Sequence, residues 1–260
     1  MKTFLSLLLF LSTVVRAECQ LRPRDRKIYS LSSPVTKVFE ELGLLQNLTG
    51  ISVFYPGGEK FKGEKIPGGI FLAPGKLKEM KDALIFYDQG QELRKLFRKQ
   101  GLKAIEIVTR GQTPGETVSH VVKTLRPYLR DCDLEGLLIR VKDLEKRITK
   151  SMKERLKIVF FLGEVKEGRL PELVVVEDGL VLWLKRQGLV ETYPTGFAYA
   201  SWSGAILEEL KKDHLLLGLK EGKAGVSGTP KRATLTFPGS LAPGLHQLEA
   251  WEFFLGHPPH

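Results

Sequence analysis

The sequence predicts an α/β protein made of two Rossmann-like lobes with parallel sheets, joined by one long helix. Up to about residue 130, short apolar segments alternate with amphipathic ones, as in repeated strand–helix units. The same alternation resumes after the charged run at residues 133–157. We therefore expect an N-terminal lobe at residues 18–132, a connecting helix at 133–157 and a C-terminal lobe at 158–260.

The connecting helix is predicted from the spacing of its apolar residues. These recur every three or four positions, which places them on one stripe of a helix. They are Leu134, Leu137, Leu138, Val141, Leu144, Ile148 and Met152. Charged side chains occupy the other faces, so the alternative is an ordinary surface helix that joins nothing.

The first 17 residues have the pattern of a secretory signal peptide. Lys2 gives a positive start, residues 4–15 are mostly apolar and Ala17 is a small residue suited to cleavage. The apolar run is shorter than the roughly 20 residues that a membrane-spanning helix needs. We therefore expect an exported, periplasmic protein. Loss of Lys2 and Arg16 lowers the formal net charge from +10 to +8.

Two cysteines, Cys19 and Cys132, remain after that cleavage. In an oxidising compartment they are predicted to form a disulfide that ties the N-terminal arm to the start of the connecting helix. Two unpaired buried thiols are the alternative. A lipid anchor at Cys19 is a third possibility, to which Glu18 is a poor fit.

The basic composition suits an anionic ligand or surface, or simply a lysine-rich surface without a partner. Nucleic acid is not an expected partner, because the positive residues are scattered and no aromatic-basic motif is present.

The N-terminal lobe is predicted to contain a parallel sheet. The expected strands are residues 27–32, 48–54, 83–87 and 103–108, the expected helices are 35–42, 76–81, 91–100 and 113–130, and a long loop covers 55–69. The strand at 83–87 is continuously apolar, as a sheet buried on both faces requires. Loops at the carboxyl ends of parallel strands line ligand crevices. The candidate ligand-binding residues in these loops are Ser32, Ser33, Tyr55, Asp88, Gln89 and Arg110.

Two of these candidates have alternative roles. Arg110 could bind a carboxylate or phosphate with two hydrogen bonds, or it could be an ordinary surface arginine. Asp88 could instead cap the helix that begins near Gln91.

The C-terminal lobe repeats the pattern less regularly. The expected strands are 157–162, 173–176, 215–217 and 233–237, the expected helices are 180–187, 206–211 and 245–255, and a flexible loop covers 218–229. Tyr193, Tyr199 and Trp202 lie in a stretch that contains glycine and proline. Their rings offer apolar contact area for a large ligand, or they pack within their own lobe.

Two segments carry a resemblance to a known family. They are KIYSLSSPVTKVFEELGLLQNLTGISVFYPGG at residues 27–58 and FPGSLAPGLHQLEAWEFFLG at 237–256. The first contains a strand, a Ser-Leu-Ser turn, a helix ending in Leu-Gly, a strand and a Tyr-Pro loop. This order resembles the periplasmic substrate-binding proteins of ABC importers for vitamin B12, siderophores and haem.

The resemblance implies the helical-backbone periplasmic binding protein fold. It also implies a monomer that captures a bulky small molecule, of metal-chelate or cobalamin type, in a cleft between the lobes. Such proteins are not enzymes and carry no cofactor of their own. Because one helix joins the lobes, we expect only modest opening and closing.

Partnership with an ABC permease is a weaker implication. Family members usually carry one docking glutamate in each lobe, and the matching positions here, near Lys76 and Gly204, are not acidic. Glu79 and Glu208 lie within a turn of these positions and are the candidate substitutes. The alternative function is therefore a scaffold or interaction protein without a transporter role.

No catalytic or metal-binding motif points elsewhere. The chain lacks a Gly-x-Ser-x-Gly elbow, a Walker A sequence and a Gly-x-Gly-x-x-Gly turn, and its five histidines are dispersed. We therefore predict neither metal nor cofactor. An enzyme on the same fold remains a third hypothesis, for which the sequence names no catalytic group.

Overall fold

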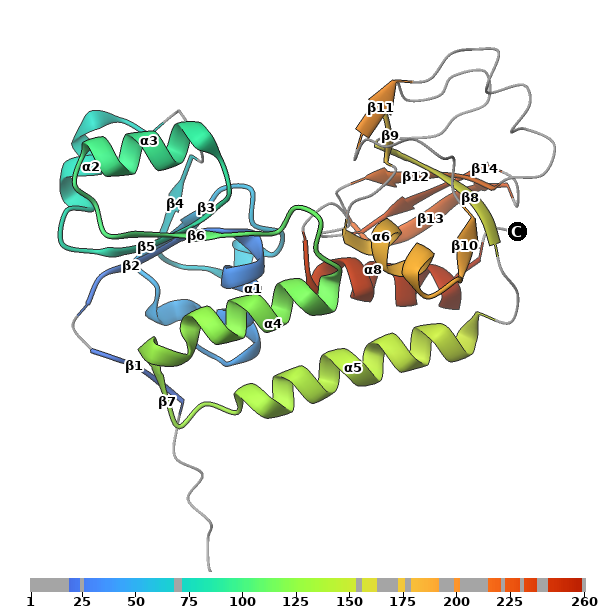
Figure 1. The fold of residues 1–260 in the computed structure, drawn as a ribbon, viewed down its shortest axis with the longest axis horizontal. Helices are drawn as coiled ribbons and strands as arrows, with labels where there is room; N and C mark the ends of the chain where they lie inside the picture. The colour runs from blue at the N-terminus through green and yellow to red at the C-terminus, as the bar shows by residue number, and fades with distance from the viewer. Residues whose placement is uncertain are drawn as a thin grey trace, which may run out of the picture.

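The computed structural model describes most of the chain and shows two lobes above one long helix (Figure 1). The described residues are 19–23, 26–67, 72–152, 156–162, 173–175, 179–191, 199–201, 215–220, 223–229, 232–237 and 243–258. The predicted signal peptide at residues 1–17 lies outside them. Among the described residues, no helix is long and apolar enough to cross a membrane.

The N-terminal sheet has five strands in the order β4-β3-β2-β5-β6, and all its pairings are parallel. The strands are β2 (Ile28–Leu31), β3 (Gly50–Ser52), β4 (Glu64–Ile66), β5 (Leu84–Asp88) and β6 (Ala104–Ile107). The predicted parallel sheet is therefore confirmed in this half. Strand β4 and a short 3-10 helix, η2 (Gly58–Lys60), lie where the sequence predicted only a loop.

Helices cover both faces of this sheet. They are α1 (Ser33–Glu41) and α4 (Pro114–Leu125) on one face, and α2 (Pro74–Glu79) and α3 (Gln91–Lys99) on the other. Pro34 lies in the first turn of α1, where its missing N–H costs nothing, and Gly43 follows the end of the helix with a φ of +73°. In α4, Thr113 and Glu116 form a reciprocal capping box.

The end of α4 differs from the prediction. It ends at Leu125, and η4 (Arg126–Tyr128) with β7 (Leu129–Arg130) replaces its expected last turn. Pro127 explains the break, because its ring clashes with the preceding helical turn and it has no N–H to donate. Strand β1 (Gln20–Leu21) pairs antiparallel with β7, and a disulfide joins Cys19 to Cys132. That bond occupies the sulfur that a lipid anchor at Cys19 would need.

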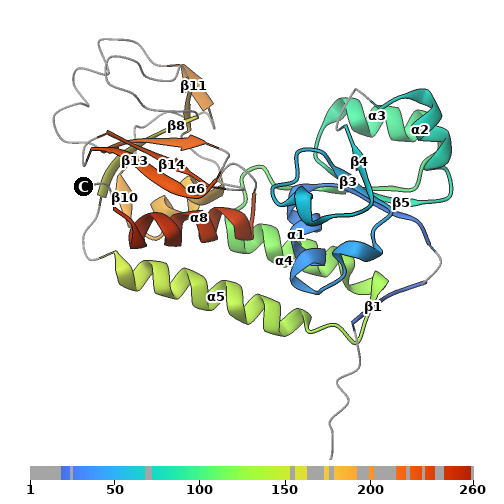
Figure 2. The same cartoon turned by 180° about the vertical axis from the view of Figure 1, so that it is seen from behind.

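The connecting helix is α5 (Leu134–Ser151), and it runs as one piece beneath both lobes (Figures 1 and 2). The Asp133 side chain accepts a hydrogen bond from the Gly136 N–H at 2.8 Å and so caps its start. The helix ends earlier than the predicted residue 157. From Leu156 the chain is extended in β8 (Leu156–Leu162), whose β-branched and aromatic residues favour a strand.

The C-terminal sheet is mixed rather than entirely parallel as predicted. Within the described residues it has seven strands, in the order β11-β9-β8-β12-β14-β13 with β10 paired to β8. The remaining strands are β9 (Leu173–Val175), β10 (Val190–Glu191), β11 (Tyr199–Ser201), β12 (Leu215–Lys220), β13 (Gly225–Thr229) and β14 (Arg232–Thr236). Strand β13 and the second half of β12 lie where a flexible loop was predicted. The helices described in this half are α6 (Gly179–Arg186) and α8 (Leu245–Gly256).

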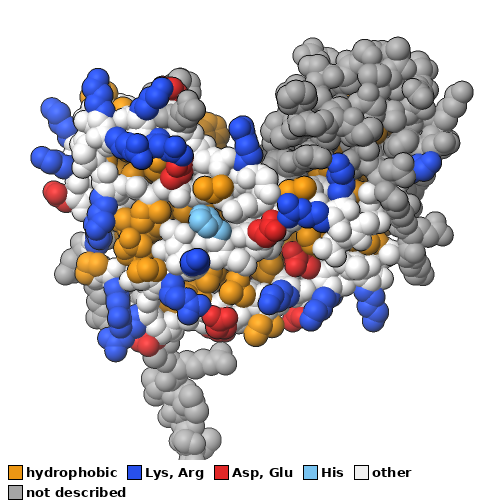
Figure 3. Space-filling view, in the orientation of Figure 1, with side chains coloured by type: hydrophobic (Ala, Val, Ile, Leu, Met, Phe, Trp, Pro, Cys, Tyr) orange, Lys and Arg blue, Asp and Glu red, His pale blue; other side chains and the backbone are white. Residues whose placement is uncertain are grey.

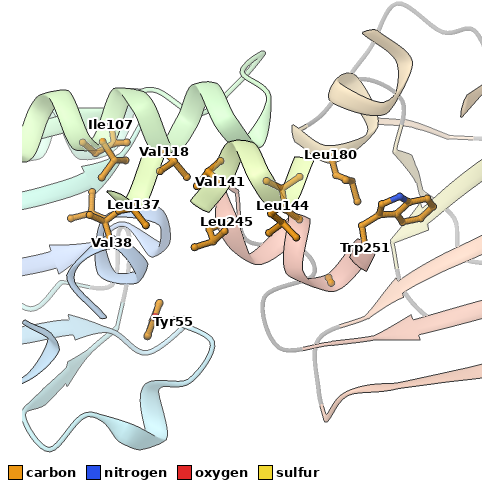
Figure 4. Packing of buried hydrophobic residues seen from close by; sticks show 14 of the residues in the cluster. Val38, Tyr55, Ile107, Val118, Leu137, Val141, Leu144, Leu180, Leu245 and Trp251 are labelled. Atoms are coloured by element: carbon orange, nitrogen blue, oxygen red, sulfur yellow. The ribbon is translucent and has the colours of Figure 1, made fainter. Parts of the chain in front are cut away.

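A single hydrophobic cluster extends from one half of the molecule to the other. Helix α8 packs against α5, α4, α1 and α6, so it touches helices from both sides of the connecting helix in sequence. Figure 4 shows buried residues of both halves, from Val38 to Trp251, following one another along α5. The two lobes are therefore held together by a shared core as well as by their connection.

Candidate functional site

The candidate site lies at the carboxyl edge of the N-terminal sheet, where four predicted residues end two neighbouring strands. Strand β2 pairs with β5, with Leu31 opposite Tyr87. The next residues along the two strands, Ser32 and Asp88, therefore come together. Ser33 and Gln89 follow them, so this part of the predicted site is assembled by the pairing of β2 with β5.

Asp88 is the titratable group of this edge. Burial raises its pKa to about 6, although the nearby Ser32 hydroxyl and Ser33 backbone lower it in part. Among the described residues, neither Asp88 Oδ1 nor Ser32 Oγ has a hydrogen-bond partner within bonding distance, and both atoms are buried. The edge therefore holds a buried carboxyl group and a buried hydroxyl next to each other.

Hydroxyl groups behind this edge fix the start of α1. Thr36 Oγ1 lies 2.7 Å from Ser30 Oγ and 3.0 Å from the carbonyl oxygen of Ser32. The hydroxyl of Ser30 donates to the same carbonyl at 3.1 Å. All three residues are buried. The Ser32 backbone is thus held from behind while its side chain is left unbonded.

Arg110 lies at the end of the next strand, β6. The turn after that strand is closed by the Gln112 N–H, which donates to the Thr109 carbonyl, and Gly111 adopts a φ of +73° there. Arg110 is exposed and has no ion-pair partner among the described residues. Its guanidinium can therefore meet an anionic group of a ligand.

Tyr55 does not project into solvent, as a side chain lining an open cleft would. It is buried, and its hydroxyl donates to Glu40 Oε2 at 2.5 Å. Its ring centroid lies 5.6 Å from that of His246 on α8. The side chain therefore fills the junction between the halves, and its predicted role in ligand contact remains a prediction.

Exposed apolar side chains that the sequence did not single out lie at the same edge. Val53 and Phe54 follow β3, and Val108 follows β6; their exposed fractions are 44%, 72% and 40%. Strands β3 and β6 are separated by β2 and β5, and neighbouring strands lie about 4.8 Å apart. The apolar groups thus flank the polar centre of the edge across about 14 Å.

The predicted ligand residues of the C-terminal lobe cannot be placed in the same way. Tyr193, Trp202 and the docking candidate Glu208 lie outside the described residues. Tyr199 belongs to β11, where it pairs with Val175, but its side chain is not among those described.

The other docking candidate, Glu79, is exposed and lies on α2. Lys76 Nζ lies 2.6 Å from its carboxylate, lowers its pKa and also binds Glu64. Lys76 therefore offsets the charge that a docking glutamate would present.

Among the described residues, no three histidine, cysteine, aspartate or glutamate side chains converge on one point. Figure 3 shows lysine and arginine side chains spread over the described face, with apolar areas between them.

A hollow of about 510 Å³ lies apart from the carboxyl edge, between α4, α5 and α6. Across it, Arg186 Nη1 on α6 binds the Glu116 carboxylate on α4 at 2.9 and 3.1 Å. This ion pair is a polar link between the halves.

Comparison with solved structures relates about nine-tenths of the chain to one architecture. A periplasmic haem-binding protein, HutB of Vibrio cholerae, has 15% sequence identity and a TM-score of 0.61, with 89% of this chain and 98% of that chain covered. The vitamin B12-binding protein BtuF of the same organism has 13% identity and a TM-score of 0.63, with 89% and 95% covered. An ABC transporter substrate-binding protein from Listeria monocytogenes has 13% identity and a TM-score of 0.58, with 88% and 98% covered.

The chain has the two-lobe periplasmic binding protein fold. No family model matches the sequence, and no curated protein matches it closely. The fold class predicted from weak motifs in a consistent order is therefore confirmed at the level of structure, at sequence identities too low to carry function across.

Proposed function

We propose that this protein is an exported solute-binding protein. It captures a bulky ligand of the haem, cobalamin or iron-siderophore type between its lobes and delivers it for ABC-type import. The similarity over about nine-tenths of the chain to proteins named for haem and vitamin B12 supports this role. The observation that carries it is the open carboxyl edge, where exposed Phe54 and Val108 flank a polar centre.

Binding at this edge requires no chemical step, so the proposed role is not enzymatic. Phe54, Val53 and Val108 supply apolar contact, and burying the exposed Phe54 ring contributes about 2 kcal/mol. Arg110, Gln89 and Ser33 orient the polar groups of the ligand. Ser32 and Asp88 lie behind them, and we assign the ring contacts from the second lobe to Tyr193, Tyr199 and Trp202.

The protonation state of Asp88 determines whether its carboxyl group can donate a hydrogen bond to a ligand. Below its pKa of about 6 the carboxyl group is neutral and can donate a hydrogen bond, and above that pKa it only accepts. A ligand that presents a carboxylate to this group binds more weakly as the pH rises from 5 to 7.

Only small relative movement of the lobes accompanies binding. The shared hydrophobic cluster, the Glu116–Arg186 pair and the contacts of α8 all cross between the halves. Small-angle scattering of free and ligand-loaded protein should show nearly unchanged radii of gyration, and a large compaction would contradict this account.

Ligand titration with paired variants tests the proposal. Haemin, cyanocobalamin and ferrichrome are titrated against the full mature protein and followed by absorbance or calorimetry. For the ligand that binds, Phe54→Ala should weaken affinity roughly 10- to 30-fold, because about 2 kcal/mol of apolar contact is lost.

The matched control for this titration is Ile139→Ala. Ile139 is another exposed large apolar residue, 58% accessible, and it lies on α5 rather than at the carboxyl edge. The control should bind as wild type. Equal losses in both variants, or no binding of any of the three compounds, would count against the edge as the ligand site.

The second candidate function is a scaffold or interaction protein without a transporter role. The pairing of Glu79 with Lys76 favours it, because the candidate docking carboxylate is already bound. Uptake of labelled ligand by the producing cells separates the two roles. If a permease docks here, Glu79→Gln should slow uptake. The control is Glu92→Gln, which removes an exposed carboxylate on the neighbouring helix α3 and should leave uptake unchanged. Unchanged uptake in both variants favours the scaffold.

Export is a separate part of the proposal. The disulfide between Cys19 and Cys132 is a bond that persists in oxidising compartments. N-terminal sequencing of the protein from the cell envelope should begin at Glu18, and an intact Met1 in that fraction would contradict cleavage.

A further inference from the structure

Two neighbouring residues after β3 have opposite surroundings. Phe54 is 72% exposed, whereas Tyr55 is only 3% exposed. The Phe54 N–H donates to the Ser52 hydroxyl at 3.2 Å, and the Tyr55 N–H donates to the Ser52 carbonyl at 3.1 Å. The buried tyrosine therefore anchors the short turn that presents the exposed phenylalanine.

The anchor is attached to the junction between the lobes. The Tyr55 hydroxyl donates to Glu40 on α1, and Lys37 Nζ lies 3.7 Å from the same carboxylate. Lys37 also binds Glu249 on α8 at 3.2 Å. We refer to Lys37, Glu40, Tyr55 and Glu249 as the clasp, since together they join the turn after β3 to the C-terminal helix.

The clasp is held by charges in a mostly buried setting. Burial alone lowers the pKa of Lys37, but Glu249, Glu41 and Glu40 together outweigh it and raise that pKa. Burial raises the pKa of Glu249, but His246 and Lys37 outweigh it and lower that pKa. Both partners are therefore ionised near neutral pH, and removing Lys37 takes away the one clasp residue that binds the carboxylates of both α1 and α8.

Resting on the proposed function, we propose that Tyr55 is a positioning residue. It holds Phe54 at the ligand edge through the clasp, so that the position of α8 determines how firmly the ligand-facing turn is fixed. This role differs from direct ring contact with the ligand, which the sequence suggested for Tyr55. It also gives the C-terminal helix, about 190 residues away in sequence, influence over the N-terminal half of the site.

Hydrogen exchange of the ligand-free protein tests the coupling independently of any ligand. Glu249→Gln, Lys37→Met and Tyr55→Phe are compared with wild type over residues 53–61. The Tyr55 and Gly58 amides are protected there by bonds to Ser52 and Tyr55. All three variants should exchange roughly tenfold faster in this turn, with Lys37→Met the most affected.

Lys60→Met is the matched control. Lys60 also binds Glu40, at 3.1 Å, but it is exposed and makes no contact with α8 in the clasp. In Lys60→Met, the amide exchange rates of the turn should stay within twofold of wild type. If Glu249→Gln loosens α8 alone and leaves the turn unchanged, the coupling is wrong. If Lys37→Met does not fold, Glu249→Gln and Tyr55→Phe decide the matter by themselves.

Ligand affinity is the second measurement. If the coupling and the proposed function are both right, Tyr55→Phe weakens binding of the compound that responds to Phe54→Ala and has no additional effect in a Phe54→Ala background. Faster exchange without any binding of haemin, cyanocobalamin or ferrichrome would retain the coupling and reject the proposed function. Weaker binding in Tyr55→Phe with unchanged exchange would overturn the positioning role and favour direct contact.

Discussion

All pairings in the five-stranded N-terminal sheet are parallel, whereas β8–β9, β9–β11 and β13–β14 in the C-terminal sheet are antiparallel. The difference follows from the length and content of the connections. In the N-terminal half, helices α1, α2 and α3 each carry the chain back across the sheet. Only residues 230–231 separate β13 from β14, and a parallel crossover needs a dozen or more. Whether neighbouring strands run parallel or antiparallel thus depends on the segments that connect them rather than on the strand sequences.

The two halves also differ in the interactions that stabilise them. The N-terminal half has a disulfide, a capped α4 and an edge with unsatisfied polar atoms. In the described C-terminal half, the sheet is extended by a tight hairpin, and α8 and Arg186 of α6 contact the other half. Variants directed at one half at a time show whether the shared core makes the two behave as one folding unit.

Removal of the disulfide should have the largest effect. The bond closes a loop of 113 residues in the unfolded chain, and its loss is expected to lower the free energy of unfolding by about 4–5 kcal/mol. Urea unfolding of the Cys19→Ser/Cys132→Ser double variant measures this. Reduced wild type is the control and should match the variant. One transition, shifted as a whole, would indicate coupled halves, and two transitions would show that they unfold separately.

Replacement of Asp88 should have an intermediate, pH-dependent effect. Its pKa is raised from 3.8 to about 6 on folding, so the folded state holds the proton more tightly and stability falls as pH rises through that window. Asp88→Asn should therefore raise the free energy of unfolding by about 2–3 kcal/mol at pH 7 and by almost nothing at pH 4. Unfolding of variant and wild type at both pH values gives the difference, and equal gains at the two values would be inconsistent with a buried acid.

The smallest effect concerns glycines, one in each half. Gly228 in β13 has a φ of +113°, and a Cβ there would lie 2.1 Å from the Arg232 carbonyl oxygen. Gly101 after α3 has a φ of +64° with open space around it. Gly228→Ala should cost about 2 kcal/mol and Gly101→Ala about 1 kcal/mol, since the second carries only the backbone strain. Thermal unfolding measures the loss of stability in each variant. A larger loss in Gly101→Ala than in Gly228→Ala would show that the β13–β14 hairpin relaxes to accommodate the added Cβ.

Much of the N-terminal fold could be predicted because its signals are local. The continuous apolar run at residues 83–87, Pro34 at the start of α1 and Gly43 after its end all act within a few residues. Strand β13 was missed because Gly225–Thr229 is polar and rich in small residues, and only its pairing with β14 makes it a strand.

The candidate site was predicted in part, and its exposed apolar residues were missed because of the strand boundaries. The predicted strands 48–54 and 103–108 were too long, so Phe54 and Val108 were placed inside strands and not in the loops expected to contact a ligand. In the structure these strands end at Ser52 and Ile107, where their pairing partners end, and the apolar residues beyond them project into solvent. Tyr55 was assigned to the cleft because it follows a predicted strand, and its contacts with Glu40 and His246 could not be predicted because they join segments far apart in the sequence.

The position of the N-terminal arm has a practical consequence. Helix α4 follows the carboxyl end of β6 and runs back antiparallel to the strands, so β7, β1 and the disulfide lie at the opposite, amino edge of that sheet. A fluorophore or a sensor-chip linker attached just before Cys19 would therefore emerge on the far side from Phe54 and Arg110. Immobilised in that orientation, the protein would leave its proposed capture edge free for screening candidate compounds.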